Sequence, residues 1–166
     1  MQEEGGQPRV AAARGVSAAP RLGFLVPAFF SALPLAALFL AVNMAGPGGA
    51  GSAELVFGLV YLAALPPVAA GVYNVARLLG EAGCGGLPQP VALAALAPGL
   101  YSVALSFAAR RLRGCGVPGF EAPGSPLFDA LLSLATVGLH TMVVAVGFER
   151  MLDVAYSRLV AGQKPR

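Results

Sequence analysis

Four polar side chains recur at helical spacing within an apolar segment of the chain. They are Asp129, Ser133, Thr136 and His140, separated by four, three and four residues, and this spacing places them on one face of an α-helix. A carboxylate, two hydroxyls and an imidazole in a row can conduct protons or bind an ion, because an imidazole changes its charge near neutral pH. The same side chains also join helices by hydrogen bonds. We favour this structural interpretation over a proton path or a binding site.

A second set of candidate residues surrounds prolines in the middle of the chain. Broken helices expose backbone carbonyls, and such carbonyls bind ions and substrates in transporters. The alternative, which we favour, is that the prolines only shape the helices and the tyrosines lie at a membrane interface. The set comprises Pro66, Pro67, Tyr73, Asn74, Pro98, Gly99, Tyr101, Ser102 and Ser106.

Sequence motifs for enzymatic chemistry are absent from the chain. It contains no G-x-S-x-G, H-E-x-x-H, C-x-x-C or P-loop pattern, which are typical of hydrolases, zinc proteases, redox enzymes and nucleotide-binding proteins. His140 is the only histidine, so a haem or metal ion would need a partner ligand from another chain. We therefore expect no catalytic residue, no metal and no cofactor.

The composition is that of a membrane protein. Of 166 residues, 57% are apolar and 11% are charged, and the mean hydropathy is +0.73. Ordinary soluble domains carry about 25% charged residues, and a chain of this size cannot easily bury so much apolar surface in water. The basic residues are spread over several short segments, so the composition excludes nucleic-acid binding and makes the lipid bilayer the expected surroundings.

The apolar runs predict an all-α integral membrane protein. We expect a four-transmembrane-helix bundle over residues 22–161, with a kinked second and third helix and an extended fourth helix. A mobile tail is expected over residues 1–21 and a short tail over 162–166. The predicted spans cover about 22–45, 54–76, 91–109 and 126–148, and the last continues as a helical extension over 149–161.

The distribution of basic residues orients the predicted bundle. With four spans, eight positively charged residues lie on the side of the two termini and three, Arg110, Arg111 and Arg113, lie on the other. The positive-inside rule then places a multi-pass protein in the cell membrane with both termini in the cytoplasm. The three arginines conflict with this arrangement, and a third segment that re-enters the membrane instead of crossing it is the alternative.

The two cysteines distinguish these arrangements. Cys84 and Cys115 are the only cysteines and can form at most one disulfide. With four crossings they lie on opposite faces of the membrane and cannot pair within one chain. With a re-entrant third segment they share a face and can pair.

We predict from these features a small integral membrane protein that acts as a non-enzymatic structural, accessory or assembly subunit. Its expected partner is another membrane protein or a second copy of the chain. The alternative is a small oligomeric transporter or channel that uses the polar face from Asp129 to His140. The substrate or partner is not identified by the sequence.

Overall fold

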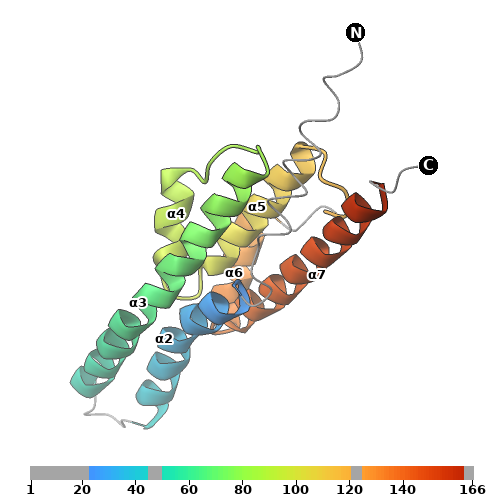
Figure 1. Cartoon of the computed structure of the whole chain (residues 1–166). Helices are drawn as coiled ribbons and strands as arrows, with labels where there is room; N and C mark the ends of the chain where they lie inside the picture. Colours follow the sequence, from blue (N-terminus) through green and yellow to red (C-terminus); the bar gives the residue numbers. More distant parts are fainter. Residues whose placement is uncertain (1–22, 45–49, 121–124, 163–166) are drawn as a thin grey trace.

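A computed structural model describes residues 23–44, 50–120 and 125–162, and this part of the chain is helical, without strands (Figure 1). The helices are α2 (Leu25–Met44), α3 (Ala50–Glu81), α4 (Gln89–Leu96), α5 (Tyr101–Gly114), α6 (Pro126–Ala135) and α7 (Leu139–Gly162). The residues expected to form the two tails fall largely outside these ranges.

Two of the described helices are long and apolar enough to span a membrane, where the sequence predicted four. They are α2, with a mean hydropathy of 2.3, and the segment Gly51–Glu81 of α3, with a mean hydropathy of 2.0. The two helices pack side by side in opposite directions, and their joined ends extend beyond the rest of the molecule (Figure 1). The predicted four-span bundle is therefore not confirmed.

The predicted third span, 91–109, is divided into two helices. Proline disfavours a helical conformation at the residue before it, and Ala97, which precedes Pro98, has extended backbone angles. Gly99 then takes a positive φ of 75°, which reverses the chain so that α5 returns alongside α4 (Figure 1). At 1.5 Å per residue, the eight residues of α4 cover only about 12 Å.

The predicted fourth span, 126–148, is likewise divided, at residues 136–138. The Val137 amide donates to the Leu134 carbonyl at 3.2 Å, and the Gly138 amide donates to the Ser133 carbonyl at 2.6 Å. Both residues have positive φ, 54° for Val137 and 85° for Gly138. These bonds form a Schellman-type helix end, after which α7 runs back beside α6 and continues to Gly162.

The structure therefore contains two helical hairpins, α4–α5 and α6–α7, whose tips meet on α2. At the tip of the first hairpin, the Gly99 amide donates to the Ser31 carbonyl at 2.7 Å. At the tip of the second, Gly138 lies so close to α2 that a Cβ added to it would be 2.7 Å from the Ala32 Cα. Because α2 continues to Met44, about 20 Å of helix extends past both tips.

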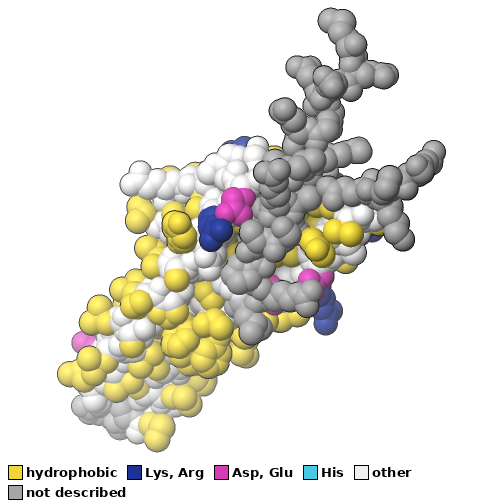
Figure 2. Space-filling model, viewed as in Figure 1, with side chains coloured by type: hydrophobic (Ala, Val, Ile, Leu, Met, Phe, Trp, Pro, Cys, Tyr) yellow, Lys and Arg dark blue, Asp and Glu magenta, His cyan; other side chains and the backbone are white. Residues whose placement is uncertain are grey.

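The hydrophobic core lies on the other side of the tips, among α2, α3, α5 and α7. Phe24 and Phe148 pack edge to face with ring centroids 5.1 Å apart, and Tyr101, Leu105 and Leu112 are fully buried members of the same core. Beyond the tips, α2 and α3 expose large apolar side chains, which cover the lower end of the molecule in Figure 2. These side chains include Phe39, Leu40, Val42, Met44, Leu55, Leu59 and Leu62.

Candidate functional site

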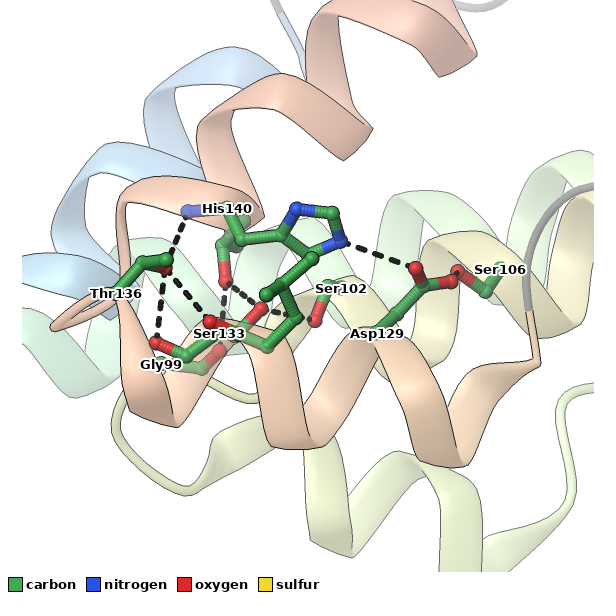
Figure 3. A network of polar contacts seen from close by, with 9 residues as sticks. Gly99, Ser102, Ser106, Asp129, Ser133, Thr136 and His140 are labelled. Atoms are coloured by element: carbon green, nitrogen blue, oxygen red, sulfur yellow. Dashed lines mark hydrogen bonds and ion pairs between the residues drawn. The ribbon is translucent and has the colours of Figure 1, made fainter.

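The two hairpins are joined by a ladder of buried polar side chains. Ser102 and Ser106 are four residues apart on α5, and Asp129 and Ser133 are four residues apart on α6, so each pair shares a helical face. The Ser102 and Ser133 hydroxyl oxygens are 3.0 Å apart, and the Ser106 hydroxyl donates to Asp129 Oδ2 (Figure 3). All four residues are buried, so the ladder is part of the packed interior.

Asp129 also bonds to α7. His140 Nε2 lies 3.0 Å from Asp129 Oδ1, and the two side chains are 17% and 8% exposed (Figure 3). Both carboxylate oxygens of Asp129 are therefore engaged, one by each hairpin. Asp129 also lies in the first turn of α6, where the helix dipole favours a negative charge.

Thr136 closes the turn between α6 and α7. Its hydroxyl donates to the Leu132 carbonyl at 2.8 Å and accepts the His140 amide at 3.0 Å. The predicted polar face is therefore not one continuous helical stripe. Thr136 ends the helix that carries Asp129 and Ser133, and it caps the helix that carries His140.

Thr141 connects the ladder to the tip of the first hairpin. Its hydroxyl donates to the Gly99 carbonyl at 2.6 Å and lies 3.0 Å from Ser133 Oγ. On the α2 side, Ser31 Oγ accepts the Tyr101 amide at 3.4 Å. We call this set the polar network; it consists of Ser31, Gly99, Ser102, Ser106, Asp129, Ser133, Thr136, His140 and Thr141.

The structure thus joins the first candidate set to part of the second. Gly99, Ser102 and Ser106 belong to the polar network, whereas Pro66 and Pro67 lie inside the unbroken helix α3. The side chains of the remaining members of the second set also lie outside the polar network. Tyr73 is 66% exposed, Asn74 is partly buried, and the buried Tyr101 hydroxyl has no hydrogen-bond partner among the described residues.

Sequence reasoning missed two members of the network, Ser31 and Thr141. A signal for the ladder was present, because Ser102 and Ser106 repeat the four-residue spacing of Asp129 and Ser133. No such signal marked Ser31, which is an isolated serine on the predicted first span. Its role follows only from the position of the hairpin tips.

Glu149 forms a separate polar contact at the other end of the second hairpin. Its carboxylate lies beside the backbone amides of Leu25 and Phe24 at the start of α2, and its buried Oε1 has no hydrogen-bond partner among the described residues. Burial nevertheless raises the pKa of Glu149, and the nearby Asp153 contributes in the same direction, while the two amides lower it. This contact attaches α7 to the N-terminal end of α2.

The side chains of the polar network bond to one another and to backbone groups of the hairpin tips. Among the described residues, no group of three or more His, Cys, Asp or Glu side chains could hold a metal ion. A small apolar pocket lies beside the first hairpin tip, between Pro34, Tyr61 and Pro98. No family model, curated protein or solved structure matches the chain, so the geometry of the polar network carries the functional argument.

Proposed function

We propose that this protein is a non-enzymatic integral membrane subunit. In this proposal α2 and α3 cross the bilayer, and the two hairpins enter it from one face and present a fixed surface to a membrane protein partner or a second copy. The exposed apolar side chains of α2 and α3 support the two crossings. The exposed apolar face of α6 and early α7 supports burial of the second hairpin, and it includes Leu127, Phe128, Leu131, Leu134, Leu139 and Val143.

The positions of the basic residues support entry of both hairpins from a single face. Arg77 lies near the end of α3, and Arg110, Arg111 and Arg113 lie in the last part of α5. Arg150 and Arg158 lie in the part of α7 that is far from the tip of the second hairpin. The other five basic residues precede α2 or follow α7 in the sequence. With two crossings, all eleven basic residues fall on one side, which the positive-inside rule makes the cytoplasm. The conflict raised by the three arginines of α5 then disappears.

The depth of the hairpins explains why they need a polar network. The bilayer core is about 30 Å thick, whereas the ten residues of α6 cover about 15 Å, so the tips end within the membrane. Irregular backbone is tolerated at such depth only where protein satisfies its polar groups. At the tips, Ser31 accepts the Gly99 amide, Thr141 donates to the Gly99 carbonyl, and Ser133 accepts the Gly138 amide.

The observation that carries the proposal is the double engagement of Asp129. Its two oxygens are bonded by Ser106 and by His140, which belong to different hairpins. A fully paired buried network rigidifies the elements that it joins. A scaffold uses such rigidity, because a partner then meets a preformed surface.

A test of the proposal compares His140→Ala with Asp153→Asn, which removes an exposed charge from the same helix. The full-length protein is purified in mild detergent to identify co-purifying proteins, and it is reconstituted into liposomes to measure proton flux. The scaffold proposal expects His140→Ala to weaken assembly with the partner or second copy, and Asp153→Asn to leave it unchanged. Proton flux through the unmodified protein that His140→Ala abolishes without loss of assembly would overturn it.

A small oligomeric transporter or channel is the second candidate. It is favoured by the adjacent carboxylate and imidazole of Asp129 and His140 at a break between helices, since ionisable residues in a membrane commonly mark ion or proton pathways. The flux measurement distinguishes the two functions. A transporter predicts that Ser133→Leu and Thr136→Val also reduce flux, while the protein remains folded.

A further inference from the structure

Helix α5 is the central helix of the part of the chain that the structure describes. It contacts each of the other five described helices, and eight of its fourteen residues are buried. Its exposed residues, Arg110, Arg111, Arg113 and Gly114, are all in its last five positions. The end of α5 emerges from the bundle at the same end of the molecule as the end of α3 (Figure 1). The helix therefore carries three positive charges to one place on the surface.

The three arginines surround the end of the helix. Arg110 and Arg113 are three residues apart and share a helical face. Arg111 projects beside this face, and its guanidinium carbon lies 5.4 Å from the centroid of the Phe107 ring. A guanidinium is attracted to the face of an aromatic ring. Because Phe107 is partly buried and Arg111 is exposed, this contact holds the guanidinium where the apolar surface of the hairpin meets solvent.

The ion pairs of the described residues involve other groups. Glu81, at the end of the neighbouring α3, is bonded by Arg77 at 2.6 Å. The second ion pair of the described residues lies inside the polar network. Arg111 and Arg113 therefore have no carboxylate partner in the described part of the chain, and both guanidinium groups are open to an anion from outside it.

The length of α5 sets the depth of these arginines in the membrane. From Tyr101, beside the tip of the first hairpin, to Arg111, the helix covers about 15 Å. This length is half of the roughly 30 Å that the bilayer core measures. A tip in the middle of the membrane therefore places the arginines at the level of the lipid phosphates. A guanidinium matches a phosphate closely, since it donates two parallel hydrogen bonds to it.

We propose that the arginine end of α5 binds the phosphate of an anionic phospholipid in the cytoplasmic leaflet. The binding groups are Arg111 and Arg113, with Arg110 beside them. The proposal rests on the membrane topology given under the proposed function, because that topology places the arginines and the headgroups at one depth. The lipid holds the open end of the first hairpin at the membrane surface, while the polar network holds its tip.

The test measures lipid binding to the purified full-length protein in a non-ionic detergent by native mass spectrometry. Phosphatidylglycerol is compared with phosphatidylcholine that has the same acyl chains. The unmodified protein is expected to bind phosphatidylglycerol about tenfold more tightly. The double variant Arg111→Gln with Arg113→Gln should lose this preference. The matched control, Arg150→Gln with Arg158→Gln, removes the same charge from exposed positions of α7 and should keep it.

Three outcomes would overturn the lipid site. One is equal binding of both lipids to the unmodified protein, which needs no variant to fold. Another is an equal loss of preference in the two double variants, because the preference would then follow net charge alone. The third is displacement of phosphatidylglycerol by an equal concentration of glycerol 3-phosphate, which would indicate a site for a soluble phosphate. A micelle has no inner or outer face, so these results are independent of the topology, which accessibility in intact cells tests separately.

Discussion

Asp129 and His140 are bonded across the turn between α6 and α7, with Oδ1 and Nε2 3.0 Å apart. Their separation of eleven residues equals about three helical turns, but the helix between them is broken. The contact therefore stabilises the turn and does not extend a helical stripe. Through Ser106, the same carboxylate also holds the first hairpin.

Removing Asp129 should destabilise the protein more than removing His140. Asp129→Ala leaves both His140 and the buried Ser106 without their partner and should lower the free energy of unfolding by about 2–3 kcal/mol. His140→Ala leaves Asp129 bonded to Ser106 and should cost about 1 kcal/mol. Denaturant titration in detergent micelles measures the loss of unfolding free energy in both variants. The double variant should lose less unfolding free energy than the sum of the two single losses. Strict additivity would show that the two side chains do not interact.

Gly138→Ala should be strongly destabilising. The new Cβ would lie 2.7 Å from the Ala32 Cα, and backbone atoms of α2 cannot move away as a flexible side chain would. The positive φ of 85° adds strain, so a loss of about 2–4 kcal/mol is expected in the same titration. Gly147→Ala is the matched control, since nothing lies within 4 Å of a Cβ there. Equal stability of the two variants would mean that the hairpin tip does not rest on α2.

Val137→Gly should stabilise the protein, although it shortens a side chain. Val137 has a φ of 54°, a left-handed conformation that costs an ordinary residue about 1–2 kcal/mol. Glycine removes that strain but loses more entropy on folding, so a net gain of about 0.5–1 kcal/mol is expected. A lower thermal unfolding temperature for Val137→Gly would contradict the left-handed turn.

Glu149 should make stability fall as pH rises. Burial raises its pKa in the folded state, so the folded protein retains a proton that the unfolded chain has released. Between the ordinary glutamate pKa and the raised folded pKa, stability therefore decreases with increasing pH. Thermal unfolding measured across this window should show a smaller decrease for Glu149→Gln than for the unmodified protein. An identical pH profile for both proteins would refute the role of this carboxyl.

The sequence predicted the helical class and the polar residues better than their arrangement. The four-residue spacing of Asp129 and Ser133 follows from helical periodicity and is retained in α6. The break after Ala135 also had a signal, because Gly138 is the residue type that most often ends a helix with a positive φ, but the positive φ of the preceding Val137 had none, since valine rarely adopts it. The conformation of Val137 goes with a local hydrogen bond from its amide to the Leu134 carbonyl and with the packing of Gly138 on Ala32, and the second of these is a tertiary contact.

The turn of the first hairpin could not be predicted from the sequence either, for a different reason. Pro98 and Gly99 were evident as helix-breaking residues, but so were Pro66 and Pro67, and α3 continues through the latter pair. The sequence does not tell a proline that bends a helix from one that ends it. The turn at Gly99 is distinguished by its bonds to Ser31 and Thr141, residues far from it in the chain.

Labelling of single cysteines tests most directly whether both hairpins enter the membrane from the face that carries the basic residues. Three proteins are compared, each with one cysteine in an otherwise cysteine-free chain: retained Cys115, Glu54→Cys and Ser157→Cys. All three positions are exposed. In intact cells, an impermeant maleimide should label only Glu54→Cys, and Cys115 and Ser157→Cys should react only after lysis. Labelling of Cys115 together with Glu54→Cys in intact cells would contradict the account, because α4 and α5 would then carry the chain across the membrane.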